Sequence, residues 1–111
     1  MNIRICGTGS ALPERKITND DLSQIMDTSD EWISSRTGIK TRHLATEETT
    51  TSLAAEAAKK ALADADMKPE EVELIIAATV TPDHLVPTLS CEVQREIGAV
   101  NAVAFDLGAA C

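Results

Sequence analysis

The clearest periodicity in the chain lies between residues 51 and 65, where apolar side chains recur at helical spacing. They form one stripe made almost entirely of alanine: Ala54, Ala58, Ala61, Leu62 and Ala65. Glu56 and Lys60 stand four residues apart and can form a supporting ion pair. The pattern predicts a helix that ends before Pro69, and its small inner side chains predict very close packing against a neighbouring element.

Two later segments are apolar without polar alternation, which is typical of strands covered on both faces of a sheet. The first covers residues 72–80 and the second residues 102–106, and a helix over residues 88–97, closed by Gly98, separates them. Strand, helix, buried strand, helix, buried strand is the order of a parallel sheet with right-handed crossovers. We therefore expect an α/β fold.

The N-terminal segment predicts shorter elements. Residues 3–6 have the pattern of a short strand, and the glycines in Gly7-Thr8-Gly9-Ser10 predict a tight turn after it. Leu12 stands where a dinucleotide-binding Gly-x-Gly-x-x-Gly loop needs its third glycine, which disfavours that function. Asn19 can cap a short helix. The side chains expected on the inner face of that helix are Leu22, Ile25 and Met26.

A second helix start follows at once. Thr28-Ser29-Asp30-Glu31 has the pattern of a capping box, in which the threonine hydroxyl and the glutamate carboxylate each accept a backbone N–H. The helix is predicted to run to about Arg36 and to stop at Gly38 in the left-handed conformation. Trp32 and Arg36 are four residues apart on it, so the indole and the guanidinium share a face.

Composition and charge exclude several classes of function. In 111 residues, 43% are apolar and 25% charged, and no apolar run is long enough for a bilayer or resembles a secretory signal. A net charge of −8 disfavours a nucleic-acid-binding surface. The three cysteines are widely spaced, so we expect reduced thiols in the cytoplasm. His43 and His84 share no ligand-like spacing with them, so no metal site is expected.

Trp32 and Arg36 allow two interpretations. In the structural one, the arginine covers a half-buried tryptophan and contributes about 1 kcal/mol as a cation–π contact. In the functional one, the indole stacks on a flat base and the guanidinium holds a phosphate. The pattern by itself favours the structural interpretation.

Cys111 is the strongest candidate nucleophile. It follows a predicted buried strand and a run of small residues, where a sharp strand-to-helix turn could present a thiol to a substrate. The start of a following helix would lower the pKa of such a thiol. His84 could in principle activate it, although a lone loop histidine is more often simply solvated. Cys6 and Cys91 have the pattern of small packing residues.

Four motifs, taken in order and at their spacing, resemble one known family across all 111 residues. They are Gly7-Thr8-Gly9-Ser10 with Leu12-Pro13-Glu14, Thr28-Ser29-Asp30-Glu31-Trp32-Ile33, Arg36-Thr37-Gly38-Ile39 with Arg42-His43, and Ala104-Phe105-Asp106-Leu107 leading to Cys111. The chain resembles the N-terminal part of a β-ketoacyl-acyl carrier protein synthase III. That family contains the initiating condensing enzymes of bacterial fatty acid synthesis.

The resemblance implies a thiolase-like fold, with residues 1–111 as the N-terminal portion of its first α/β half and the second half absent. It implies that Cys111 takes an acyl group from acyl-CoA before decarboxylative condensation with malonyl-acyl carrier protein. It also implies that Trp32 stacks on the adenine of coenzyme A, with Thr28 and Arg36 as further contacts. A homodimer without a tightly bound cofactor is expected, and the histidine and asparagine partners of the thiol belong to the second half.

The chain departs from the family pattern at Val86, where members often carry a phenylalanine that reaches the partner's acyl pocket. A smaller side chain there predicts room for a bulkier primer. With the second half absent, we expect residues 1–111 to be inactive alone. Two alternatives remain: a secondary-metabolite condensing enzyme of the same fold, and a non-catalytic CoA-binding or dimerising module.

Overall fold

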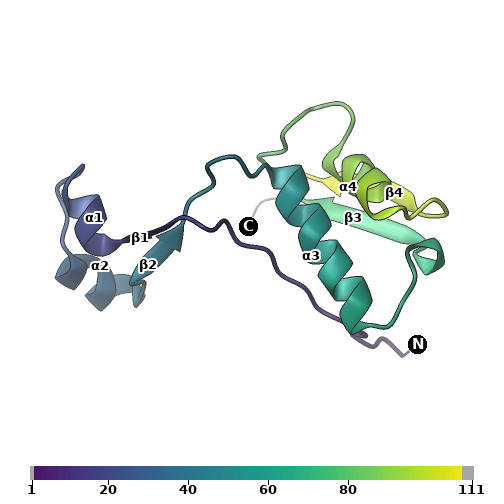
Figure 1. Ribbon diagram of the computed structural model, residues 1–111, viewed down its shortest axis with the longest axis horizontal. Coiled ribbons are helices and arrows are strands. Elements are labelled where there is room, and N and C mark those ends of the chain that lie inside the picture. The colour runs from purple at the N-terminus through teal and green to yellow at the C-terminus, as the bar shows by residue number, and fades with distance from the viewer. Residues whose placement is uncertain (1, 109–111) are drawn as a thin grey trace. The chain divides into compact units, whose positions relative to one another are not determined.

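The computed structural model describes residues 2–108, and these form two compact units (Figure 1). The smaller unit comprises residues 12–48, and the larger one comprises the described residues before and after it. The smaller unit contains β1 (Lys16–Thr18), α1 (Asn19–Ser23), α2 (Asp30–Thr37) and β2 (Thr41–His43). The larger contains α3 (Thr50–Asp64), the 3-10 turn η1 (Pro69–Glu71), β3 (Leu74–Ala78), α4 (Leu89–Ile97) and β4 (Val103–Leu107).

The larger unit is built on the parallel pair β3 and β4, with Leu74 opposite Val103 and Ala78 opposite Leu107. Helix α4 connects the two strands and ends at Gly98, whose φ of 77° is the left-handed conformation that glycine adopts without strain. The predicted helices and the parallel α/β arrangement are confirmed. Within the part of the chain that the structure describes, no helix is long and apolar enough to cross a bilayer.

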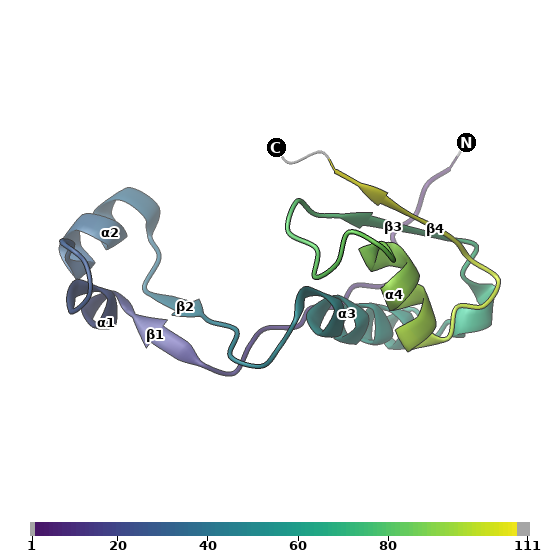
Figure 2. The same cartoon turned by 90° about the horizontal axis from the view of Figure 1, so that it is seen from above.

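Helices α3 and α4 lie on the same side of the β3–β4 pair (Figure 2). Burial accordingly alternates along both strands. The side chains of the other face are between 45% and 66% exposed: Leu74, Ile76, Val103, Phe105 and Leu107. The prediction that both strands are covered on both faces is therefore wrong for residues 2–108, because the helices described there cover one face only.

The N-terminal segment lies along α3, as Figure 1 shows, and the predicted strand at residues 3–6 is absent. A Cβ on Gly7 would lie 2.5 Å from the Ala61 carbonyl oxygen, and one on Gly9 would lie 2.5 Å from the Ala61 nitrogen. The glycines therefore allow two backbones to approach closely, instead of forming the predicted turn. Ala61 and Ala65 of the alanine stripe do pack very closely, as predicted, but the buried alanine of α3 is Ala55, which the predicted stripe omits. The ion pair between Lys60 and Glu56 is present at 2.6 Å.

The smaller unit contains an antiparallel pair, β1 and β2, that the sequence did not predict. Helix α1 is capped by Thr18, whose hydroxyl accepts the Asp21 N–H while the Asp21 carboxylate accepts the Thr18 N–H. Asn19 is thus not the cap but the buried first residue of the helix. Ile25 and Met26 lie beyond its end and are 76% and 53% exposed, which corrects the predicted inner face.

Candidate functional site

The candidate site is built on α2, whose start differs by one residue from the prediction. Ser29, in extended conformation, is the N-cap, and its hydroxyl accepts the Trp32 N–H at 3.1 Å. Thr28 is therefore outside the helix, and its hydroxyl makes no hydrogen bond within residues 2–108. The helix ends at Gly38 with a φ of 71°, as predicted.

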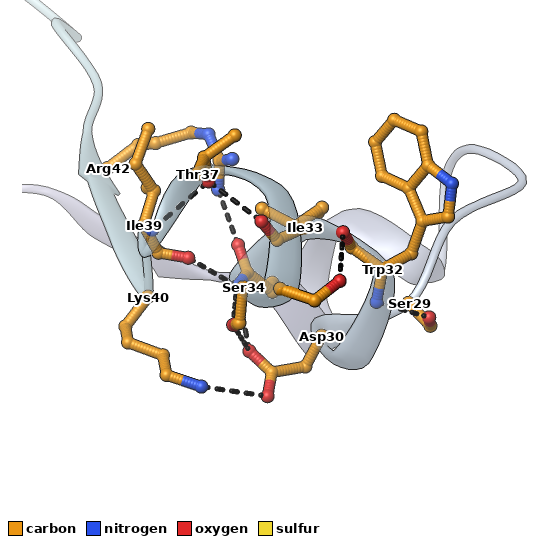
Figure 3. Close-up of polar contacts among 11 residues, drawn as sticks. Ser29, Asp30, Trp32, Ile33, Ser34, Thr37, Ile39, Lys40 and Arg42 are labelled. Carbon is orange, nitrogen blue, oxygen red and sulfur yellow. Dashed lines mark hydrogen bonds and ion pairs between the residues drawn. The ribbon is translucent and has the colours of Figure 1, made fainter.

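Trp32 and Arg36 share one face of α2, as their spacing predicts. The guanidinium carbon of Arg36 lies 4.6 Å from the centroid of the Trp32 ring, within the range of a cation–π contact. Figure 3 shows the indole projecting away from the polar contacts made by Asp30, Ser34 and Lys40. Trp32 is 54% exposed, so it is not a core residue and part of its surface is open to a ligand.

A surface hollow of about 330 Å³ lies beside the indole. Asp27, Thr28, Ser29 and Trp32 line it. An open aromatic face next to a hydroxyl can hold a flat heteroaromatic ring by stacking and hydrogen bonding. Arg36 adds a cation with donors suited to a phosphate, so the predicted site residues of α2 are brought together in an arrangement that can bind a nucleotide.

The carboxylate of Asp30 fixes the base of α2. It accepts hydrogen bonds from Asn19 Nδ2 at 2.7 Å, from Ser34 Oγ at 2.8 Å and from Lys40 Nζ at 3.2 Å. These contacts lower the pKa of Asp30 from 3.8 to about 2, so the group is ionised at neutral pH. The carboxylate of Asp30 is therefore engaged with its own partners, and the acidic residue that lines the hollow is Asp27.

Cys111, the predicted nucleophile, lies outside the described residues, and its role stays a prediction. The strand that leads toward it is in place, because β4 ends at Leu107. Cys6 and Cys91 are both exposed, so the expectation that they are packing residues is wrong. Within residues 2–108, no cluster of three or more metal-ligating side chains forms.

His84 has a contact that explains its position without catalysis. Its Nδ1 lies 3.0 Å from Oε1 of Glu92, and the other oxygen of that buried carboxylate accepts the Thr51 hydroxyl at 2.8 Å. The neighbouring Asp83 accepts the backbone N–H of Thr51 at 2.6 Å. His84 therefore helps to hold the loop after β3 against α4, and Asp83 holds the same loop against the start of α3. The sequence prediction did not include Asp83, although an aspartate is a common acceptor at a helix start.

His43 is also engaged, since its Nδ1 lies 2.6 Å from the carbonyl oxygen of Pro13. Arg42 is a second residue that the sequence does not mark as structurally important beyond its place in a motif. Its guanidinium donates to Asn19 Oδ1 at 2.7 Å. No signal in the sequence pairs these two residues, because they are brought together by the antiparallel contact of β1 with β2.

Comparison with known proteins matches the chain to one group of enzymes, although no family model matches it. It is 56% identical over 110 residues to the β-ketoacyl-[acyl-carrier-protein] synthase III of Clostridium acetobutylicum, covering 99% of this chain and 34% of that protein. The corresponding protein of Lactococcus lactis is 57% identical over 100 residues, 90% of this chain and 31% of its own length. The chain thus spans about a third of the length of the curated relatives it matches.

Solved structures agree with the sequence matches. The 3-oxoacyl-[acyl-carrier-protein] synthase III of Aquifex aeolicus superimposes with a TM-score of 0.92 at 52% identity, over 96% of this chain and 34% of that one. The priming β-ketosynthase of the R1128 polyketide pathway superimposes with a TM-score of 0.91 at 37% identity, over 96% and 32%. The thiolase-like α/β fold and the resemblance to β-ketoacyl-[acyl-carrier-protein] synthase III are confirmed over the part of those proteins that the chain covers.

Proposed function

We propose that the complete protein is an acyltransferase that initiates fatty acid synthesis by condensing acyl-CoA with malonyl-acyl carrier protein. The observation that carries the proposal is the Arg36 guanidinium 4.6 Å above the Trp32 ring, beside an open hollow. In a chain 56% identical to a β-ketoacyl-[acyl-carrier-protein] synthase III, this arrangement favours the nucleotide interpretation over the structural one.

In this proposal, α2 holds the nucleotide end of coenzyme A. Adenine stacks on the open surface of Trp32, and the Thr28 hydroxyl, which has no partner within the described residues, supplies a hydrogen bond beside it. Arg36 donates to a phosphate while its guanidinium remains near the indole. The ring and the cation are held together before the ligand arrives, which reduces the entropy lost on binding.

The chemistry is assigned to Cys111. Its thiolate attacks the thioester carbonyl carbon of acyl-CoA, a new carbon–sulfur bond forms, and the bond to the coenzyme A sulfur breaks. Coenzyme A leaves as the thiolate and takes up a proton. Malonyl-acyl carrier protein then loses carbon dioxide, its carbanion attacks the acyl-cysteine, and the β-ketoacyl product forms as the Cys111 thiolate is released.

The remaining parts of the proposal come from the same resemblance. The oxyanion-stabilising histidine and asparagine are supplied by the second half of the protein, so residues 1–111 are inactive alone. The active species is a cytoplasmic homodimer that needs no tightly bound cofactor, and acyl-CoA is bound as a substrate. Loading and condensation therefore both require the complete chain.

Intact-mass measurement after incubation with acetyl-CoA tests the proposal. The complete protein should gain one acetyl group, and Cys111→Ser should gain none. Cys6→Ser and Cys91→Ser are matched controls, because each also replaces one thiol by a hydroxyl. Both should load normally, since these exposed cysteines lie outside α2, the helix proposed to bind the nucleotide. Acetylation of residues 1–111 alone, or of the Cys111→Ser variant, would contradict the assignment.

A condensing enzyme of secondary metabolism is the second candidate, favoured by the 0.91 TM-score to the polyketide priming β-ketosynthase. It would load Cys111 in the same way and differ in the acyl group and the carrier protein. Condensation assays with the carrier proteins of fatty acid and of polyketide synthesis would separate the two. A non-catalytic CoA-binding or dimerising module would bind coenzyme A and show no acetylation in the complete protein.

A further inference from the structure

Asn19 is the most enclosed side chain of the smaller unit, with 1% of its surface exposed. Its Nδ2 donates to Asp30 Oδ1 and to the Ile39 carbonyl oxygen, both at 2.7 Å. Its Oδ1 accepts from Arg42 Nη1 at 2.7 Å. The amide therefore uses both of its N–H donors and its oxygen on three different segments.

Two of these partners, Asp30 and Ile39, lie at the two ends of α2, the helix that carries the candidate site. Asp30 is the first residue of α2, and Ile39 follows the Gly38 that ends it. Trp32 and Arg36 both lie between those two points, so one side chain holds the two ends of the helix that presents the site. Figure 3 shows the contacts of Asp30 and Ile39 gathered on one side of α2, with Trp32 on another.

Apolar packing does little to orient α2. The helix has eight residues, and Ile33 is its buried side chain. One buried apolar side chain fixes the rotation of a helix about its axis less firmly than an apolar stripe would, because a stripe packs at several points along the helix. The direction of the Trp32 indole and the Arg36 guanidinium is therefore set mainly by the polar contacts.

We infer that Asn19 is a positioning residue for the nucleotide clamp, defined as Trp32 and Arg36 of α2. It acts by holding both ends of α2 against β2, and it touches neither the substrate nor the thiol. The inference rests on the proposed function of the clamp. Loss of Asn19 should then weaken recognition of the nucleotide end of coenzyme A and leave the acyl-transfer chemistry unchanged.

The test compares two acyl donors in the complete protein: acetyl-CoA, and acetyl-pantetheine, which lacks the nucleotide. Asn19→Asp keeps the shape and the contact with Arg42 but loses both N–H donors and places a like charge beside Asp30. We expect it to raise the KM for acetyl-CoA by about tenfold or more with kcat retained, and to leave kcat/KM for acetyl-pantetheine unchanged. Asn101→Ala, which removes the Asn101 hydrogen bond to the Glu70 carbonyl elsewhere, is the matched control and should change neither.

Equal losses with both donors, or no loss with either, would overturn the inference. Trp32→Ala distinguishes a failure of the inference about Asn19 from a failure of the nucleotide clamp. If Trp32→Ala has an unchanged KM for acetyl-CoA, the proposed nucleotide site itself is wrong. If Asn19→Asp does not fold, Arg42→Met takes its place, since it keeps Asn19 and removes only the contact to β2. A rise in the KM of Arg42→Met for acetyl-CoA but not for acetyl-pantetheine would support the inference. An unchanged KM for acetyl-CoA in Arg42→Met would contradict the inference.

Discussion

The carboxylate of Asp106 in β4 accepts the backbone N–H of Ser90 in α4 at 2.8 Å, and its second oxygen accepts the N–H of Leu89 at 2.9 Å. Thr88, the residue at the N-cap position, makes no side-chain capping bond. A strand residue thus satisfies the start of the helix that precedes it in the sequence. This charge-assisted contact joins β4 to the N-terminal end of α4, where the helix dipole favours a negative charge.

Asp106→Asn should destabilise the complete protein by about 1 kcal/mol, because an amide is a weaker acceptor and one of its atoms is a donor facing N–H groups. The free energy of unfolding in urea measures the effect. Asp66→Asn is the control, since Asp66 is exposed, has a φ of 52° that asparagine tolerates, and makes no side-chain hydrogen bond within residues 2–108. Equal stability of Asp106→Asn and the control would show that the contact contributes nothing.

Acid should weaken the contact between the loop after β3 and α3. Hydrogen bonds from Thr51 and Thr50 lower the pKa of Asp83 from 3.8 to about 2. Because the folded pKa lies below the unfolded one, the stabilisation is complete above about pH 4 and is lost as the pH falls toward about 2. Asp83→Asn should therefore have a lower urea midpoint than the parent at pH 7, and the difference should shrink by pH 3. A constant difference would contradict the assignment.

Gly7 and Gly9 should not tolerate a methyl group. A Cβ on Gly7 would lie 2.7 Å from the Ala65 nitrogen, and one on Gly9 would overlap the Ala57 carbonyl oxygen, so the N-terminal segment would have to leave α3. We expect Gly7→Ala and Gly9→Ala to cost about 1–3 kcal/mol each in urea unfolding. Gly108→Ala is the control, because no atom that the structure describes in residues 2–108 lies within 4 Å of its added Cβ. Similar values for all three variants would rule out the close approach.

Local signals in the sequence predicted α3, α4 and the parallel strands within a few residues. Each has a strong marker: the alanine stripe, the left-handed glycine at Gly98, and the continuous apolar strands. The smaller unit was harder because its elements are short and its key contacts are distant in sequence. The Thr18-Asn19-Asp20-Asp21 spacing of a capping box favours Thr18 over Asn19 as the cap, a signal that the prediction overlooked, whereas the buried contact of Asn19 with Arg42 has no local signal.

The choice of cap also affected the candidate site. Thr28 and Ser29 are both good N-cap residues, so the sequence could place the capping box one residue early. The helical spacing of Trp32 and Arg36 is independent of that error, and their shared face was predicted correctly. Whether the indole is open to a ligand depends on its exposure and on the neighbouring hollow, which only the fold determines.

Because Ser29 is the N-cap of α2, the hydroxyls of Thr28 and Ser29 should have different roles, one in ligand binding and the other in stability. Ser29→Ala removes the acceptor for the Trp32 N–H and should cost about 1 kcal/mol of stability in the complete protein. Thr28→Ala should leave the free energy of unfolding unchanged but raise the KM for acetyl-CoA, since this hydroxyl borders the hollow. Urea unfolding and initial rates on both variants provide the comparison. A loss of stability in Thr28→Ala would restore the predicted capping box and remove the hydroxyl from the site.

Val86 provides a test of acyl-chain choice. It and its neighbour Leu85 are 86% and 87% exposed, so neither is committed to packing within residues 2–108. If the protein follows the family resemblance, in which a phenylalanine at this position often reaches the partner's acyl pocket, the smaller valine should admit a branched primer. Val86→Phe should lower the loading rate of a branched acyl-CoA relative to acetyl-CoA by about tenfold, the scale on which small changes of pocket volume discriminate substrates. Leu85→Phe adds similar bulk one residue away and should leave the ratio unchanged, whereas a strict acetyl preference in the parent enzyme would disprove the role of Val86.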